Sequence, residues 1–351
     1  MAPTPDIKKP WIETPIIESA TLSKIAGCRI FLKLDLLQPS GSFKSRGVGN
    51  FIRASLEEQL TSNPTKRPHF YISSGGNAGL AAVHAALDLN CKCSVVVPHS
   101  TKPFMIGRLR QIGATEVIQH GASWFEADSY LREHFIENEG CEGNVYVPPF
   151  DHHLVWEGAS SMVDEIACQM PAAEKEGEFP ADAIVCSVGG GGLFNGIIQG
   201  LQRNLGDRPA KNVRVLAVET AGAHSLALSL QEGKLSSLDK ITSQATSLGA
   251  LRVARRAFEN ASAPPPGVEV QSVVGSDAEA ARGIVRLADE TRLQVELACG
   301  ISVEVAVGKE LRRVMPTLTP ESRVVIVVCG GSNINAEMIA GYREQLEAGW
   351  E

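Results

Sequence analysis

Short apolar runs that end in glycine-rich or polar loops, each followed by a helix-like stretch, recur along this 351-residue chain. Such runs are typical of buried parallel strands, because helices on both faces of a sheet remove the alternation of apolar and polar residues. The repeated order of strand and helix predicts a doubly wound α/β fold. The clearest strand candidates are residues 70–72, 93–97, 183–188, 213–218 and 323–328.

Two of the loops between strand and helix are suited to bind anions. Residues 78–89 are rich in Ala and Leu and should begin a helix directly after the polar loop Ser73 to Asn77. Residues 193–201 should likewise begin a helix after four consecutive glycines. Both loops therefore present helix N-termini, where free N–H groups and the helix dipole favour negative charge.

Composition excludes several classes of protein. A net charge of -7 without a long basic run argues against nucleic acid or an anionic membrane as the partner, and favours a small molecule. Prolines and charges occupy the first 15 residues, where a signal peptide needs an apolar segment, and no apolar stretch reaches the ~20 residues of a membrane span. The eight cysteines are scattered, so we expect reduced thiols and a cytoplasmic location.

The segment from Ser40 to Gly47 places one lysine, Lys44, among small residues at an expected loop-to-helix junction. A lysine at a helix start is usually solvated. Phe43 and the small neighbours would instead desolvate the amine in part, which favours the neutral form that a Schiff base requires.

Three further segments lie at strand ends. Ser73 to Gly79 can receive a carboxylate, although an ordinary N-capped turn has the same composition. The glycine run from Gly189 to Gly192 resembles a phosphate cradle, although it lacks the Gly-Lys-Ser/Thr of a P-loop. The GxGxxG pattern of nicotinamide-binding proteins can be matched to it, but any run of glycines satisfies that pattern. Cys329 follows an apolar strand, where a cysteine is more often packing than chemistry.

Together these segments supply an amine, a carboxylate cradle, a phosphate cradle and a partner for a ring nitrogen. All lie where an open parallel sheet delivers its loops, at the carboxyl ends of strands. This set of groups matches what pyridoxal phosphate requires.

The chain resembles the fold-type II pyridoxal-phosphate enzymes, specifically the L-serine dehydratase / L-threonine deaminase branch. Besides the segments above, the resemblance rests on Thr14-Pro15, Pro148 to Asp151, Trp156-Glu157-Gly158, Glu219 to Ser225 and Val295 to Gly300. It implies two doubly wound open-sheet domains with the cofactor in the cleft between them. The large, cofactor-binding domain is expected at residues 1–40 plus 156–351, and the small domain at 41–155.

The resemblance also implies roles for individual residues. Lys44 forms the Schiff base, Phe43 packs against the cofactor ring, Asn77 contacts the ring hydroxyl, and Cys329 faces the pyridine nitrogen. The phosphate is held by Gly189, Gly190, Gly191 and Gly192. The substrate carboxylate is received by Ser73, Ser74, Gly75 and Asn77. A monovalent cation, potassium, is implied at Glu219, Ala223, Ser225, Leu248 and Ala250.

The implied reaction converts L-serine to pyruvate and ammonia, and L-threonine to 2-oxobutanoate, in a cytoplasmic homodimer of amino-acid catabolism and gluconeogenesis. Lys44 would remove the Cα proton. The acid that assists loss of the β-hydroxyl is either the cofactor phosphate or the protonated Lys44. Some serine dehydratases have alanine where this chain has Gly75 or Gly76, so substrate preference and turnover do not follow from the resemblance.

Other functions stay open at this point. The nearest are a serine racemase, a biosynthetic threonine deaminase and a β-replacing synthase of the same fold; we expect no regulatory domain after Asn333. A weakly active cofactor-binding protein, such as a metabolite sensor, and a nicotinamide oxidoreductase belong to other classes. The spectrum of the purified protein separates the last of these, because only a lysine-bound pyridoxal phosphate colours the protein itself.

Overall fold

The computed structural model describes residues 7–351 apart from residues 174 and 208. No helix in this described part of the chain is both long and apolar enough to span a membrane. Residues 1–6, on which the expected lack of a signal peptide partly rests, lie outside the described residues.

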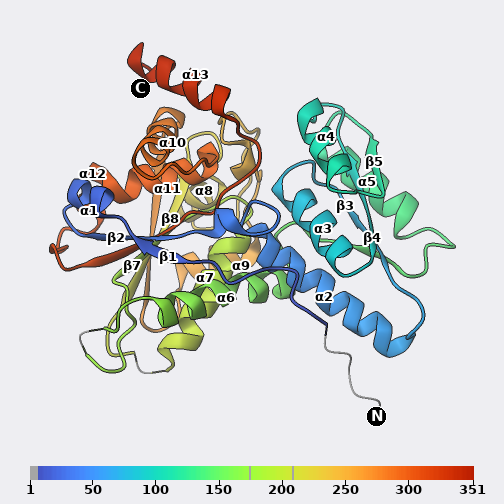
Figure 1. Ribbon diagram of the computed structural model, residues 1–351, viewed down its shortest axis with the longest axis horizontal. Helices are drawn as coiled ribbons and strands as arrows, with labels where there is room; N and C mark the ends of the chain where they lie inside the picture. Colours follow the sequence, from blue (N-terminus) through green and yellow to red (C-terminus); the bar gives the residue numbers. More distant parts are fainter. Residues whose placement is uncertain (1–6, 174, 208) are drawn as a thin grey trace. The chain divides into compact units, whose positions relative to one another are not determined.

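The chain forms two compact units, each with its own sheet (Figure 1). The small unit contains the described residues up to Ile12 together with Gln38–Gly158, and the large unit contains Glu13–Leu37 and Ala159–Glu351. Residues 1–40 were expected to belong wholly to the large unit, but the described residues up to Ile12 belong to the small one. Ile12 and Gln38 are joined there by two hydrogen bonds between backbone and side chain, of 3.1 and 2.7 Å. These bonds tie the first described residues to the small unit.

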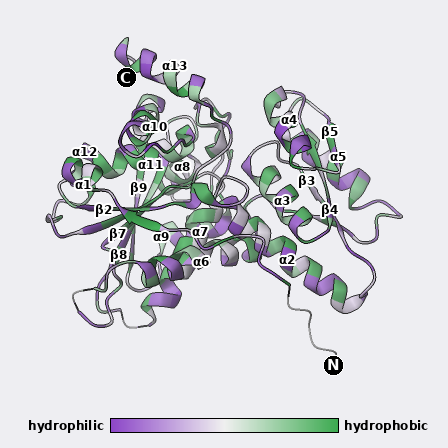
Figure 2. Cartoon of the chain, in the orientation of Figure 1, coloured by the Kyte–Doolittle hydropathy of each residue, from purple (hydrophilic) through white to green (hydrophobic). Residues whose placement is uncertain are grey.

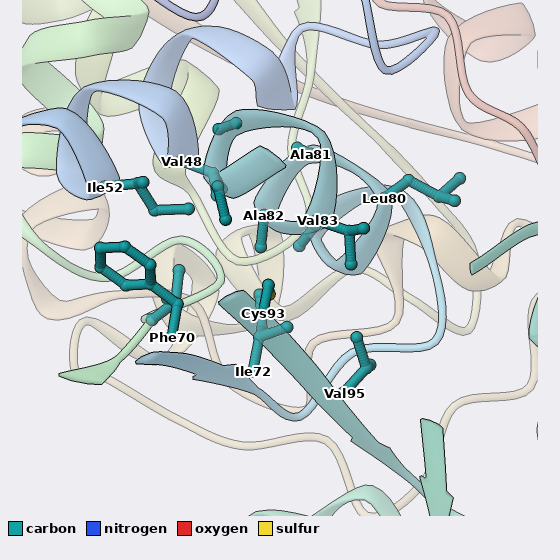
Figure 3. Close-up of a cluster of buried hydrophobic side chains, with 14 of the residues drawn as sticks. Val48, Ile52, Phe70, Ile72, Leu80, Ala81, Ala82, Val83, Cys93 and Val95 are labelled. Carbon is teal, nitrogen blue, oxygen red and sulfur yellow. The ribbon is translucent and has the colours of Figure 1, made fainter. Parts of the chain in front are cut away.

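The small unit has a four-stranded parallel sheet in the order β5-β4-β3-β6. Val48 and Ile52 of α2, Ala82 of α3, Ile72 of β3 and Val95 of β4 are buried in one apolar cluster (Figure 3). The strands are β3 (His69–Ile72), β4 (Lys92–Val97), β5 (Glu116–Gln119) and β6 (Asn144–Tyr146). The helices are α2 (Lys44–Ser62), α3 (Asn77–Asp88), α4 (Pro103–Gln111) and α5 (Trp124–Phe135).

The large unit has a six-stranded sheet in the order β1-β2-β10-β7-β8-β9, in which only β1 runs antiparallel to its neighbour. The strands are β1 (Ile16–Glu18), β2 (Arg29–Lys33), β7 (Ala183–Ser187), β8 (Val213–Thr220), β9 (Val268–Gly275) and β10 (Arg323–Val327). Strands β7 and β10 in the middle of the sheet are almost wholly buried and apolar, as expected for strands covered on both faces.

Helices lie on both sides of this sheet; Figure 1 shows α10 and α11 above the strands and α6 and α7 below them. Outer helices such as α13 carry both hydrophilic and hydrophobic residues (Figure 2). The helices are α1 (Ala20–Ala26), α6 (His153–Gln169), α7 (Gly192–Leu205), α8 (Ser225–Glu232), α9 (Arg255–Ser262), α10 (Asp277–Thr291), α11 (Leu297–Val307), α12 (Lys309–Val314) and α13 (Ala336–Glu347), with short 3-10 turns η1 (Asp35–Leu37) and η2 (Thr246–Leu248).

Helix α11 is apolar on nearly all sides and is buried along almost its whole length. It packs against α10 at very close range. A Cβ atom at Gly283 would lie 1.9 Å from the carbonyl oxygen of Gly300, and one at Gly300 would lie 2.3 Å from that of Ala280. The two glycines therefore set the distance between the helices.

All five predicted strands are confirmed, as β3, β4, β7, β8 and β10, and their ends differ from the prediction by at most two residues. The two predicted helices are confirmed as α3 and α7. The expected α/β fold with two open sheets is correct.

Candidate active site

Lys44 is the first residue of α2, and its side chain is half-buried rather than fully solvated. Its amine donates a hydrogen bond of 2.7 Å to the carbonyl oxygen of Pro149. The same amine lies 5.3 Å from the ring centroid of Phe43 and 5.9 Å from that of Phe150. A carbonyl and two rings thus hold the amine in a defined place, which a nucleophilic lysine requires.

The start of α2 is fixed by a close crossing with the first turns of α6. A Cβ atom at Gly47 would lie 2.6 Å from the carbonyl oxygen of Val155, and one at Gly158 would lie 2.3 Å from that of Arg46. Any side chain at these positions would meet backbone, which cannot yield as a flexible side chain can. Glycine at both positions therefore brings the first turn of α2, with Lys44, against α6.

The loop from Ser73 to Asn77 joins β3 to α3 and divides into an inward and a half-exposed part. Ser73 is completely buried, and its hydroxyl donates to the carboxylate of Asp128. Ser74, Gly76 and Asn77 are half-buried, and the Ser74 hydroxyl accepts a 3.4 Å hydrogen bond from the N–H of Gly76. The hydroxyl of Ser73 is thus committed to the interior of the small unit, whereas the residues that follow it are only half-buried.

Gly75 and Gly76 differ in the space around them. A Cβ atom at Gly75 would lie 2.6 Å from Cγ2 of Thr101 and 3.2 Å from Cγ1 of Val97. The nearest atom to a Cβ at Gly76 would be the Ser74 hydroxyl oxygen at 4.0 Å. An alanine is therefore accommodated at position 76, whereas at position 75 the Thr101 side chain has to move.

The glycines Gly189 to Gly192 join β7 to α7. Gly191 is the N-cap residue of this 14-residue helix and has a φ of 92°, a left-handed conformation that favours glycine. Within the described residues, none of the N–H groups of Gly189, Gly190 and Gly191 donates a hydrogen bond. Free N–H groups at the start of a helix form a site suited to an anion such as phosphate.

Neighbouring segments leave no room for side chains in this loop. A Cβ atom at Gly191 would lie 2.6 Å from that of Ala257, and one at Gly189 would lie 3.0 Å from the Cα atom of Leu248. The N–H of Ala254 donates a 3.1 Å hydrogen bond to the carbonyl of Gly190. Packing from α9 and η2 therefore fixes the backbone of the glycine loop.

Cys329 lies just after β10 and is 5% exposed. Its sulfur lies 3.5 Å from the hydroxyl oxygen of Ser187 at the end of β7. A hydrogen bond with the thiol of Cys299 on α11, together with burial, raises the pKa of Cys329 well above its ordinary value. The side chain is therefore a neutral thiol at neutral pH.

Three of the five residues expected to bind a cation lie at the end of β8 or just after it: Glu219 is in the strand, and Ala223 and Ser225 follow it. Glu219 is completely buried, and its carboxylate accepts hydrogen bonds from the N–H groups of Leu226 (2.9 Å) and Ala227 (2.8 Å). Burial raises the pKa of Glu219 to about 7. Ala223 and Ser225 are also buried, and in the described part of the chain the hydroxyl of Ser225 has no hydrogen-bond partner. A cation would compensate the carboxylate and satisfy this hydroxyl.

Leu248 and Ala250 lie in and after η2. The carbonyl of Leu248 accepts a 2.7 Å hydrogen bond from the N–H of Ala250, and Leu248 packs against Gly189. Groups of three or more His, Cys, Asp and Glu side chains that could hold a metal ion are absent from the residues described. A cation bound chiefly by carbonyl and hydroxyl oxygens needs no such group.

A family model described as "Pyridoxal-phosphate dependent enzyme" matches residues 7–330. The chain belongs to this family of pyridoxal-phosphate-dependent enzymes.

Relatives of this pyridoxal-phosphate-dependent enzyme match along nearly its whole length. It is 42% identical over 330 residues to an L-serine dehydratase of Saccharomyces cerevisiae, covering 93% of this chain and 94% of the relative. It is 39% identical to the L-serine dehydratase/L-threonine deaminase of Homo sapiens, covering 95% of each. The solved structure of a fungal L-serine ammonia-lyase from Rhizomucor miehei superimposes with a TM-score of 0.82 at 31% identity, covering 96% of this chain and 99% of that one.

The residues present in this pyridoxal-phosphate-dependent enzyme fit the cofactor. A half-buried lysine amine is held beside two aromatic rings, and a glycine loop that Cβ atoms would fill presents free N–H groups. A neutral buried thiol follows the central strand β10. These are the groups needed to anchor an aldehyde, a phosphate and a ring nitrogen.

Several contacts around the candidate site did not follow from sequence reasoning. The carbonyl of Pro149 holds Lys44, and only the adjacent prolines 148 and 149 hint at a fixed backbone there. The buried Glu296, at the N-terminus of α11, accepts from the hydroxyl of Ser247 and, at 2.6 Å, from the N–H of Asn333. Glu296 thereby joins η2 to the segment after Cys329. The sequence pointed to Glu296 only as one residue of the segment 295–300.

Proposed function

We propose that this enzyme dehydrates and deaminates L-serine to pyruvate and ammonia, and that it converts L-threonine to 2-oxobutanoate. The observation that carries the proposal is the match to an L-serine dehydratase of Saccharomyces cerevisiae, 42% identical over 93% of this chain. The human relative is named for both activities. The half-buried Lys44 and the free N–H groups of the glycine loop supply the groups that such a reaction needs.

The proposed binding roles follow from the chemistry of each group. Lys44 anchors pyridoxal phosphate covalently, and Phe43 packs against its ring. The N–H groups of the loop Gly189–Gly192 hold the phosphate, and Asn77 binds the ring hydroxyl. Cys329 faces the ring nitrogen as a neutral thiol.

When bound, the cofactor supplies a conjugated ring that accepts the electrons left at Cα after the proton departs. Nζ of Lys44 would be the base that takes this proton. Either this nitrogen, now protonated, or the cofactor phosphate would give a proton to the departing β-hydroxyl. The neutral thiol of Cys329 does not hold a proton on the ring nitrogen as firmly as a carboxylate would, which favours rapid loss of the leaving group.

The substrate carboxylate is proposed to bind in the loop from Ser73 to Asn77. Because the Ser73 hydroxyl donates to Asp128, the loop contributes its backbone N–H groups with the side chains of Ser74 and Asn77. These donors satisfy a carboxylate without a buried positive charge, as anions at helix N-termini are commonly held.

We further propose that potassium binds at Glu219, Ala223 and Ser225, with carbonyl groups of Leu248 and Ala250. The partnerless Ser225 hydroxyl and the raised pKa of the buried Glu219 support this assignment. We also propose that the protein acts in the cytoplasm as a homodimer, in amino-acid catabolism that feeds gluconeogenesis.

The test is turnover by the purified, cofactor-loaded protein. L-serine should give pyruvate and ammonia in equal amounts, and L-threonine should give 2-oxobutanoate. Chiral analysis of the remaining serine and assays with an added thiol nucleophile distinguish the related activities. Accumulation of D-serine without pyruvate, or consumption of serine only when the nucleophile is present, would contradict the proposal.

A further inference from the structure

A buried carboxylate lies behind the loop that is proposed to receive the substrate. Oδ1 of Asp128 accepts hydrogen bonds from the hydroxyl of Ser73 and, at 2.8 Å, from that of Tyr146. Oδ2 of Asp128 accepts from Nε of Arg132 at 2.8 Å. We call these four residues the Asp128 cluster; all belong to the small unit and come from α5, β6 and the end of β3.

Stability alone does not explain an acid at this position. Asp128 is 8% exposed, and its neighbours Ala127 and Leu131 on α5 belong to an apolar cluster with Tyr71 and Val96. Taking a carboxylate out of water is unfavourable, and an ion pair with a partner as exposed as Arg132, whose side chain is 42% exposed, adds little stability. The acid therefore points to a requirement for defined hydrogen bonds.

The cluster satisfies the carboxylate and orients it. The guanidinium of Arg132, one helical turn from Asp128, lies 3.8 Å from the ring centroid of Tyr146 and supplies the opposite charge. Burial, with the nearby Asp128 charge, raises the pKa of Tyr146 to about 12, so its hydroxyl remains a donor. Both carboxylate oxygens are thus held in place, and Oδ1 faces Ser73.

Tyr146 is itself held firmly by the sheet. It pairs with Tyr71 across β3 and β6, and the next residue, Val147, donates a 2.8 Å hydrogen bond to the carbonyl of Tyr71. Asp128 therefore connects a residue fixed in the sheet to Ser73, where β3 has ended and the loop begins. Without this connection the side chain of Ser73 would have no fixed direction, and the loop would lose its first anchor.

We propose that Asp128 is a positioning residue that fixes the Ser73–Asn77 loop and thereby sets the affinity of the enzyme for the substrate carboxylate. This inference rests on the proposed function for the site of carboxylate binding. A loop that is not held in advance must be ordered when the substrate binds, which weakens binding. Because the carboxylate does not change during the reaction, KM should rise while kcat is nearly constant.

The experiment compares kinetics of cofactor-loaded variants with those of the wild type. For Asp128→Ala we expect KM for L-serine to rise about tenfold, the effect of losing a hydrogen bond to a charged group. Asp128→Asn should restore most of the affinity, because its amide oxygen still accepts from Ser73. Ser73→Ala should raise KM similarly, and the double variant Ser73→Ala/Asp128→Ala should be no worse than the single ones.

Glu57→Gln is the matched control. Glu57 forms an ion pair with Arg53 elsewhere in the small unit, and the two residues are four positions apart, as Asp128 and Arg132 are. Its KM should equal that of the wild type. The inhibition constant of L-alanine, which has the carboxylate but no leaving group, should rise in parallel with KM. If Asp128→Ala does not fold, Tyr146→Phe with Ser73→Ala provides the same cycle.

Unchanged KM, additive effects of Ser73→Ala and Asp128→Ala, or an equal fall in kcat would each overturn the inference. Failure of the proposed function is detected separately, as absence of pyruvate and 2-oxobutanoate from the wild type. In that case the affinity for L-alanine, read from the absorbance of the bound cofactor, tests the role of Asp128 without turnover.

Discussion

A Cβ atom at Gly158 would lie 2.3 Å from the carbonyl oxygen of Arg46, so the first turns of α2 and α6 cross with no space for a side chain. Gly158→Ala must separate the helices and move Lys44, and overpacking of this kind lowers the free energy of unfolding by about 2 kcal/mol. Gly341→Ala is the control. Gly341 is also inside a helix, but a Cβ there meets nothing within 4 Å, so alanine should stabilise the protein by about 0.5 kcal/mol. Denaturant unfolding and turnover are measured for both.

Lys44→Ala should lose the absorbance of the lysine-bound cofactor and reduce turnover roughly a thousandfold or more, because it removes the residue proposed to be both anchor and base. Lys92→Ala changes an exposed lysine on β4 and should alter neither. Borohydride reduction followed by peptide mapping should place the cofactor on residue 44 of the wild type. A labelled peptide elsewhere would refute the assignment.

Gly191→Ala should weaken binding of pyridoxal phosphate by at least about tenfold, since alanine is strained at positive φ and its Cβ would displace Ala257. Gly206, at the other end of α7, also has a positive φ, but a Cβ there meets nothing within 4 Å. Gly206→Ala should therefore reduce stability by about 1 kcal/mol without changing cofactor affinity. Absorbance titration and Tm separate the two effects; equal losses of affinity would argue against the glycine loop as phosphate site.

The pH dependence of stability should report Glu219. Its pKa is about 7 in the folded chain against an ordinary 4.5, so between these values the folded state keeps a proton that the unfolded state has lost. Stability should therefore fall as pH rises from 4.5 to 7, by at most about 3 kcal/mol. Potassium bound at the proposed site would favour the ionised carboxylate, so the effect of potassium on Tm should be larger at pH 8 than at pH 5.5.

Glu219→Gln should remove both dependences, and tetramethylammonium chloride at equal ionic strength controls for salt. A potassium effect on Tm that survives in Glu219→Gln would place the cation elsewhere.

Cys329→Asp should increase transamination relative to elimination several-fold, because a carboxylate keeps the ring nitrogen protonated more firmly than the neutral thiol. Cys329→Ser stays neutral and should leave the ratio of products unchanged. Pyruvate and transamination products are quantified from the same reaction. An unchanged ratio in Cys329→Asp would remove Cys329 from this role.

Much of the fold follows from local pattern. Apolar runs such as Ala183 to Val188 are strands because they are buried on both faces, and the glycine loop must follow one of them for its N–H groups to be free. Strands with weaker patterns were not predicted. Strand β2 contains the buried Lys33, whose charge is balanced by Glu165 at 2.5 Å, a partner 132 positions away.

Side-chain pairings over long distances limit what sequence shows of the site. Ser73 lies in a loop whose sequence is typical of ligand binding, but its hydroxyl donates to Asp128, 55 positions later in the chain. Likewise, the amine of Lys44 binds a carbonyl 105 positions away, at Pro149. Such contacts depend on which helices and strands pack together, and no local periodicity records them.

The contact between Gly283 and Gly300 has a consequence for how this chain can diverge. Cys299, next to Gly300, hydrogen-bonds the thiol of Cys329. A shift of α11 would therefore move the partner of that thiol. A larger residue at 283 cannot be absorbed by a compensating change at 300, where glycine is already the smallest residue. We therefore expect neither position to accept another residue during evolution. Changes that tune the proposed contact between Cys329 and the ring nitrogen must then come from residues outside this helix pair.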